Sequence, residues 1–105
     1  MINYEDFKKL DLVVGKIIEA ENVENSSKLI KLQVDIGNEK RQIIAGIKSN
    51  YLPSDLVGKE IIVLINLEPR VIFGLESQGM LLAADSDKPV ILTPLNEVPP
   101  GTKIQ

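Results

Sequence analysis

The sequence Asn66-Leu-Glu-Pro-Arg-Val-Ile-Phe-Gly-Leu-Glu-Ser-Gln-Gly-Met80 lies between two short apolar runs, residues 61–65 and 81–84. Pro69 removes a backbone donor that a sheet would use, and two glycines allow backbone angles that other residues avoid. The end of the stretch offers a hydroxyl, an amide and a thioether within four residues. This combination predicts a hairpin between two strands, and its polar groups suit a recognition surface better than a catalytic centre.

Outward from this hairpin, apolar residues alternate with polar ones or run together in short segments, which indicates strands. The predicted strands are residues 12–23, 28–36, 41–47, 61–66 and 79–84. We expect a bend or bulge at Gly15, where a strand would curl around a small barrel. The one long connection, residues 48–59, contains a short helix start at Pro53. Five strands with the long connection between the third and fourth are typical of an all-β protein with small α content, the five-stranded OB-fold barrel.

The two ends of the chain read differently from the barrel. Residues 3–10 predict a short N-terminal helix capped by Asn3, either a solvated end helix or a dimer contact. After residue 85 come prolines and a short apolar strand, yet the tail keeps apolar residues that an unbound tail rarely needs. We therefore expect a single domain over residues 1–105, with a core at 11–84 and a C-terminal extension at 85–105. The simplest role for the extension is to cover an open end of its own barrel.

Composition excludes several classes of protein. No apolar run approaches the ~20 residues of a membrane span, and the N-terminus has acids where a secretory signal has bases. The default interpretation is a cytoplasmic protein. There is no histidine or cysteine, which removes the commonest general bases, nucleophiles and metal ligands. We therefore expect no enzyme activity, no metal site and no cofactor.

The net charge of −3 does not point to nucleic-acid binding, because phosphate-binding proteins usually carry a basic field. The chain also has only four aromatic residues, and only Tyr51 and Phe73 are placed where they would face a ligand. Single-strand binders of this fold stack bases on aromatic side chains. Recognition of a folded RNA by its shape, phosphates and 2′-hydroxyls needs fewer aromatics and fits this chain better.

Several ordered motifs nevertheless resemble one family. They are Asp6-Phe7-Lys8-Lys9-Leu10-Asp11-Leu12, Val14-Gly15-Lys16-Ile17, Lys28-Leu29, Val34-Asp35-Ile36-Gly37, Arg41-Gln42-Ile43-Ile44-Ala45-Gly46-Ile47, Asn66-Leu67-x-Pro69 and Gly74-x-Glu76-Ser77-Gln78-Gly79-Met80-Leu81-Leu82-Ala83-Ala84. Together they resemble the tRNA-binding domain at the C-terminus of methionyl-tRNA synthetases. The same domain occurs in free-standing tRNA-binding proteins, in tyrosyl-tRNA synthetases of higher organisms and in endothelial monocyte-activating polypeptide.

The resemblance implies a tRNA-binding module, either free-standing or a separate subunit of methionyl-tRNA synthetase that supplies an auxiliary tRNA site. It also implies a homodimer built with the C-terminal extension. An alternative function is implied by the secretion chaperone of the same fold, which binds unfolded peptides. Salt-dependent binding of folded tRNA supports the first function, and salt-tolerant binding of an extended apolar peptide supports the second.

The expected tRNA-binding residues combine the resemblance with their chemistry. They are Lys28, Lys31, Arg41, Asn66, Arg70, Ser77, Gln78 and Met80. Several of them also have a purely structural interpretation. Lysines on a strand are usually solvated, Asn66 would only terminate a strand, Met80 would be part of the core, and Ser77 would bond the backbone of its own turn. The chain departs from the family by carrying Glu68 where a lysine is common, Val13 for a frequent arginine, and one base in the hairpin. These departures remove positive charge from the expected RNA-facing side.

Overall fold

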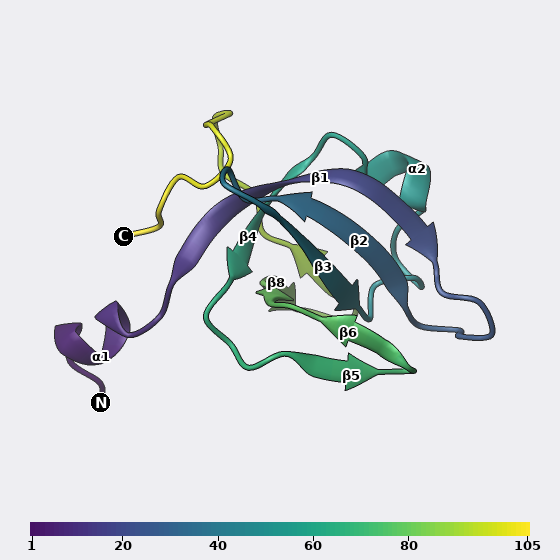
Figure 1. Ribbon diagram of the computed structural model, residues 1–105, viewed down its shortest axis with the longest axis horizontal. Helices are drawn as coiled ribbons and strands as arrows, with labels where there is room; N and C mark the ends of the chain where they lie inside the picture. Colours follow the sequence, from purple (N-terminus) through teal and green to yellow (C-terminus); the bar gives the residue numbers. More distant parts are fainter.

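Five strands form the main antiparallel sheet of the computed structural model, which describes residues 1–105 (Figure 1). They are β1 (Leu12–Asn22), β2 (Ile30–Asp35), β3 (Lys40–Ala45), β4 (Glu60–Leu64) and β7 (Met80–Leu81), in the order β3-β2-β1-β4-β7. Two ribbons are added, β5 (Arg70–Ile72) with β6 (Leu75–Ser77) and β8 (Ala83–Asp85) with β9 (Pro89–Ile91). The helices are α1 (Tyr4–Lys8) and α2 (Pro53–Leu56). The predicted five-stranded barrel is confirmed, because the sheet curls until β3 meets β6 and β7.

The long strand β1 is the one around which the sheet curls, since its first half pairs with β4 and its second half with β2. The pairing with β2 shifts between Ile17 and Glu19, which places a bulge at Ile18. The bulge predicted at Gly15 is therefore misplaced. Gly15 sits in regular pairing with β4, and a Cβ atom there would lie 2.5 Å from Val34 Cγ1. Its lack of a side chain serves the close approach of β2.

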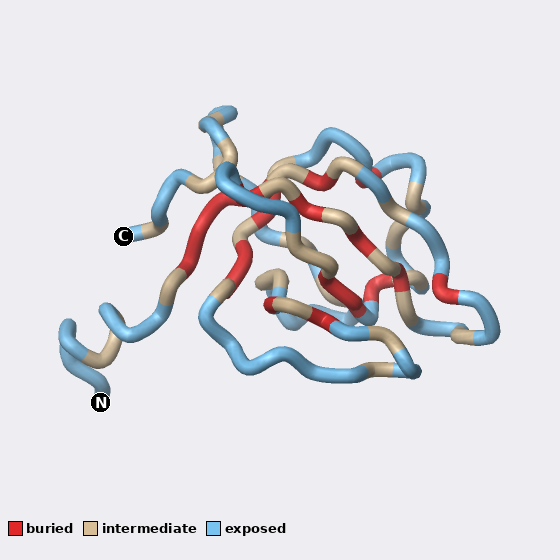
Figure 2. The backbone as a smooth tube through the Cα atoms, in the orientation of Figure 1, coloured by how far each residue is buried: buried red, intermediate tan, exposed pale blue.

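The barrel interior is apolar and drawn from every strand of the sheet. Along β2, Ile30, Leu32 and Val34 are fully buried while the residues between them face outward, as the alternation predicts. Figure 2 shows buried positions along β1 to β4. Each such aliphatic side chain stabilises the fold by about 1.5–3 kcal/mol relative to leaving it exposed. This core holds the strands that carry the surface residues discussed below.

The predicted fifth strand, residues 79–84, is interrupted after β7. The Leu82 N–H still donates to the Ile62 carbonyl at 3.0 Å, but the Leu82 carbonyl accepts the Leu92 N–H at 3.1 Å. The chain then turns away into the β8–β9 ribbon, which packs Ile91 against the core. The apolar run therefore divides between the main sheet, through β7, and the β8–β9 ribbon.

The C-terminal tail returns to the start of β1. The Val14 N–H donates to the Thr102 carbonyl at 2.8 Å, and the Gly101 N–H donates to the Val14 carbonyl at 2.7 Å. The Ile104 N–H donates to the Leu12 carbonyl at 2.9 Å. Because β2 pairs with β1 only from Lys16 onward, this edge of β1 would otherwise have no partner. The tail therefore covers an open edge of its own barrel.

Helix α1 projects away from the barrel (Figure 1) and buries none of its residues. Its start is capped as predicted: the Asp6 N–H donates to Asn3 Oδ1 at 2.9 Å, and the Asn3 N–H donates to Asp6 Oδ2 at 3.2 Å. The helix ends at Lys8, earlier than the predicted residue 10. On the apolar side of the helix, Tyr4 and Leu10 remain exposed and Phe7 is partly buried.

Candidate nucleic-acid interface

The eight expected tRNA-binding residues lie in three parts of the molecule rather than in one patch. Around the base of the β5–β6 hairpin lie Arg41, Arg70, Ser77, Gln78 and Met80. Asn66 follows β4 next to the end of α1. Lys28 and Lys31 lie in the β1–β2 loop and at the start of β2.

One small hollow brings three of these residues together at the hairpin base. It is lined by Ile44, Leu67, Glu68, Arg70, Ile72, Ser77, Gly79 and Met80. The Arg70 and Met80 side chains are exposed at its rim, whereas Ser77 is only 5% exposed. Glu68 also lines the hollow and adds a carboxylate to it. The Arg70 guanidinium and the apolar Met80 side chain thus lie at the rim of the hollow, and Ser77 lies beneath them.

The Ser77 and Gln78 side chains are occupied in closing the barrel. The Ile44 N–H donates to Ser77 Oγ at 3.0 Å, and the Ser77 hydroxyl donates to the Gly79 carbonyl at 3.1 Å. The Gln42 N–H donates to Gln78 Oε1 at 2.9 Å, and the Gln78 N–H donates to the Gln42 carbonyl at 2.7 Å. These side chains replace the missing strand partner of β3. We call this set, with Arg41, the closing seam.

Arg41 completes the closing seam with its guanidinium. One Arg41 nitrogen, Nη1, donates to the carbonyls of Ile65 and Gln78, both at 3.0 Å. The other two donate to Glu39 Oε1, which forms an ion pair at 3.1 Å from Nη2. The side chain is therefore held by three segments of its own chain.

Asn66 joins the end of β4 to the segment between α1 and β1. Its Nδ2 donates to the Lys9 carbonyl at 2.7 Å, and its Oδ1 accepts the Asp11 N–H at 2.9 Å. Both polar atoms of the amide are thus used within the chain. The residue does more than end a strand, since it sets where helix α1 leaves the barrel.

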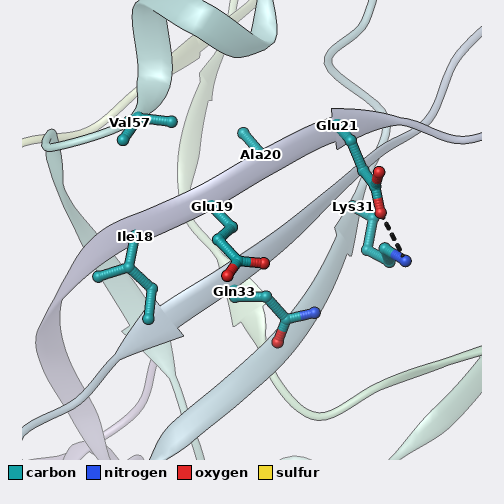
Figure 3. A pocket seen from close by; sticks show the side chains of 7 residues that line it. All are labelled: Ile18, Glu19, Ala20, Glu21, Lys31, Gln33 and Val57. Atoms are coloured by element: carbon teal, nitrogen blue, oxygen red, sulfur yellow. Dashed lines mark ion pairs between the residues drawn. The ribbon is translucent and has the colours of Figure 1, made fainter.

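Lys31 lies on the outer face of β1 and β2, in a shallow hollow of the barrel wall (Figure 3). Its Nζ is 2.7 Å from Glu21 Oε1, and Glu19 and Gln33 lie beside this pair. Two carboxylates against one ammonium group make this face unfavourable for phosphate. Lys28, by contrast, is exposed in the adjacent loop, and its side chain makes no ion pair or hydrogen bond.

A chain of amides on the same face was missed from the sequence. Gln33 Nε2 donates to Gln42 Oε1 at 3.1 Å, and Gln42 Nε2 donates to the Glu76 carbonyl at 2.8 Å. Gln78 Nε2 donates in turn to Glu76 Oε1 at 3.1 Å. The only sequence signal was the outward position of Gln33 in the alternating β2 pattern. Its partners lie far along the chain, so the connection itself is a tertiary feature.

A third hollow lies between the β1–β2 loop and the tip of the β5–β6 hairpin. It is lined by Glu21, Asn22, Val23, Glu24, Asn25, Lys31, Phe73 and Leu75. Phe73 is 58% exposed. Elsewhere, no three His, Cys, Asp or Glu side chains are grouped to hold a metal ion, and neither helix has the length and apolar character to cross a bilayer.

The chain is similar to known proteins over nearly its whole length. Residues 12–103 match the family described as "Putative tRNA binding domain". The chain is 57% identical to the methionine–tRNA ligase of Methanoregula boonei and 53% identical to that of Archaeoglobus fulgidus, over 100% and 98% of its residues. It spans 16% of the length of each of these relatives.

Solved structures of similar proteins also superpose closely on this chain. The MetRS-related protein from Pyrococcus horikoshii superposes with a TM-score of 0.94 at 38% identity, covering 100% of this chain and 98% of that one. The chaperone CsaA from Bacillus anthracis superposes with a TM-score of 0.92 at 36% identity, covering 100% and 99%. The family match, the relatives and the barrel agree: this chain belongs to the tRNA-binding domain family related to methionyl-tRNA synthetase.

Proposed function

We propose that this chain is a non-catalytic tRNA-binding module that supplies an auxiliary tRNA site to methionyl-tRNA synthetase. The observation that carries this proposal is the family match over residues 12–103, together with 57% identity to a methionine–tRNA ligase across the whole chain. The module acts either within the synthetase chain or as a separate subunit. We place it in the cytoplasm, alongside the enzyme that it serves.

An auxiliary site of this kind works through effective concentration. A second, weak contact with the same tRNA makes rebinding intramolecular, so overall affinity rises without any new contact at the active site. A chain without histidine or cysteine suits a holding role better than a chemical one. A chain with a net charge of −3 can neutralise few phosphates, so we expect its binding of tRNA to be weak.

The structure favours Arg70 and Lys28 as the tRNA contacts among the expected residues. Both are exposed, and neither side chain has an ion pair or hydrogen bond in the chain, so no internal contact is lost on binding. Met80 offers an apolar surface at the rim of the Arg70 hollow for a base or sugar. In this proposal Arg41, Asn66, Ser77 and Gln78 shape the surface by fixing the hairpin and the end helix.

We further propose that the module is a homodimer. Exposed apolar side chains mark the two chain ends: Ile2, Tyr4 and Leu10 around α1, and Leu95, 98% exposed, in the tail. Figure 1 shows α1 and the C-terminal end on the same side of the barrel. In this proposal the second copy covers these side chains, because large exposed apolar surface is typical of protein interfaces. Sedimentation equilibrium should give twice the chain mass, and Leu95→Asp should shift the species towards the monomer.

The test of tRNA binding is a gel-shift titration with unfractionated tRNA at two salt concentrations. We expect affinity to fall with salt, and Arg70→Ala to weaken binding and reduce the salt slope by about one, the value for one lost phosphate contact. The melting temperature of the variant should match that of the wild type, because the Arg70 side chain makes no internal bond.

The matched control is Lys59→Ala, an exposed cation beside α2 that lies outside the hairpin region. It should leave both affinity and salt slope unchanged. Equal losses for the two variants would show that only total charge matters and would remove the Arg70 assignment. No tRNA shift at either salt concentration would contradict the proposed function itself.

The second candidate function is peptide binding, favoured by the similarity to the chaperone CsaA. Ile72 and the exposed Phe73 on the hairpin would supply its apolar contacts. Titration with an unfolded apolar peptide at the same two salt concentrations separates the two functions. Tight, salt-insensitive peptide binding without tRNA binding would favour this candidate.

A further inference from the structure

The tip of the β5–β6 hairpin holds a bulky side chain in a conformation that side chains rarely adopt. Phe73 and Gly74 form the two-residue turn, with φ angles of 56° and 79°. Turns with two positive φ angles favour asparagine or glycine at the first position, and a phenylalanine there is an outlier. The strain is accompanied by exposure, since 58% of the Phe73 surface faces solvent. Strain at an exposed aromatic is evidence of a function rather than of packing.

Phe73 lines the hollow shared with the β1–β2 loop, which has a volume of about 460 Å³. Figure 1 shows the hairpin tip and this loop at the same end of the barrel. The volume falls within the range of ~300–1,000 Å³ that is usual for small-ligand sites. Because the closing seam anchors β6 to β3, the position of the tip is set by the barrel.

Three polar residues of this hollow differ from those of the closing seam, because their side chains are unpaired. The side chains of Asn22, Glu24 and Asn25 line it, and none of them makes a hydrogen bond or an ion pair within the chain. Lys31, the single cation there, is already paired with Glu21 at 2.7 Å. Two carboxylates against one ammonium group disfavour a phosphate. Amide and carboxylate oxygens instead suit the amino groups on base edges.

We propose that this hollow holds one unpaired nucleobase of the bound RNA, stacked on the Phe73 ring, with its exocyclic amino group facing Glu24 and the two asparagines. The inference rests on the proposed tRNA-binding function and adds a base-stacking site to it. An aromatic ring accepts any base face, and stacking accounts for a large part of single-strand affinity in this fold. Unstacked bases in loops and ends are the parts of a folded RNA that proteins commonly reach. The cations outside the hollow then hold phosphates, and Phe73 holds a base.

The test uses Phe73→Asn, which removes the ring and also relieves the turn, because asparagine tolerates positive φ. We expect the melting temperature to stay at or above that of the wild type while affinity for unfractionated tRNA falls by roughly 5- to 100-fold. Val71→Ala is the matched control, an exposed apolar residue on the same hairpin that does not line the hollow. It should leave tRNA affinity unchanged.

A direct readout comes from Phe73→Trp, because the chain contains no tryptophan of its own. Its fluorescence should be quenched by tRNA and by oligo(C), less by oligo(U), and not by a blunt RNA duplex, which offers no unpaired base. Val71→Trp should show no quenching with any of these probes.

The outcomes separate this site from the proposed function. Salt-dependent tRNA binding that Phe73→Asn leaves intact would overturn the stacking site and keep the function. Equal quenching by duplex and oligo(C) would also overturn it. Quenching by an unfolded peptide but not by RNA would assign the hollow to peptide instead. A wild-type protein that binds no tRNA would overturn both.

Discussion

The barrel completes two strand edges in different ways. At the closing seam, the N–H groups of Gln42 and Ile44 on β3 donate to side-chain oxygens of Gln78 and Ser77. At the other edge, β1 exchanges backbone hydrogen bonds with the tail residues 101–104. Pairing at the β3 edge therefore requires particular side chains, whereas pairing at the β1 edge requires mainly the right position of the backbone.

This difference in pairing explains why residues 76–79 form a recognisable sequence motif and the tail residues 101–104 do not. A side-chain partner must have the right oxygen at the right distance, so the seam leaves a recognisable polar pattern at residues 76–79. Backbone partners accept almost any side chain, so the tail carries no such pattern apart from Gly101. A polar motif in a small barrel is thus evidence of a specific contact, and that contact can be internal.

Among the variants that test this comparison of the two edges, Ser77→Ala is expected to lose the most stability. The change leaves the buried Ile44 N–H and the Gly79 carbonyl without their hydroxyl partner. We expect a loss of about 1–3 kcal/mol in the free energy of unfolding, the cost of an unsatisfied buried group. Chemical denaturation measures it.

Ser54→Ala is the control for this loss, because Ser54 is exposed in α2 and its side chain makes no hydrogen bond. It should change stability by less than about 0.5 kcal/mol. If the two serine variants proved equally stable, the seam would not depend on the side-chain hydroxyl.

A loss of similar size is expected for Gly101→Ala at the tail edge: about 1–2 kcal/mol for the positive φ alone, with the clash of the new Cβ atom added to it. Gly101 has a φ of 89°, and a Cβ atom there would lie 2.5 Å from the Ile36 carbonyl oxygen. Amide hydrogen exchange should show faster exchange at Val14, whose N–H donates to the Thr102 carbonyl.

The matched control is Gly58→Ala, because Gly58 has the same φ of 89° but open space around its Cα. Its loss of stability should reflect the backbone strain alone, because no clash is added. The Val14 amide should remain protected from exchange. A Gly58 variant as unstable as the Gly101 variant would mean that the tail's close approach contributes nothing.

The smallest effect is expected for Lys103→Ala. Lys103 Nζ lies 3.1 Å from Asp11 Oδ1, and the two side chains are 70% and 37% exposed. Exposed pairs contribute about 0–1 kcal/mol, and salt screens them further. Thermal unfolding at low and high salt should differ little between this variant and the wild type. A loss comparable to that of Gly101→Ala would show that the tail is held by charge rather than by its backbone.

Much of the fold was predictable because its causes are local. Alternation along β2 marks the inward face, and the Asn3 cap needs only the residues of the first helical turn. The errors came where the cause is distant. The bulge at Ile18 depends on the register with β2, and the break after β7 depends on a ribbon partner that follows later in the chain.

The sequence suggested which polar residues matter but not how they are arranged. Ser77 and Gln78 were predicted to contact tRNA; in the structure their side-chain oxygens accept N–H groups of β3, more than 30 residues earlier. Asn66 likewise bonds the Lys9 carbonyl, 57 residues away. Composition gave no sign that Phe73 would lie beside the β1–β2 loop, since the two meet only when the barrel closes.

By itself the sequence determined the barrel class, the inward faces of the strands, the helix cap and the family, because these depend on periodicity and on short ordered motifs. The tertiary structure alone decided which polar side chains are bonded within the chain and which are left for a ligand. The physical reason is that each donor binds whatever acceptor the closed barrel brings within about 3 Å. That distance is set by the packing of all the strands together, not by neighbours along the chain.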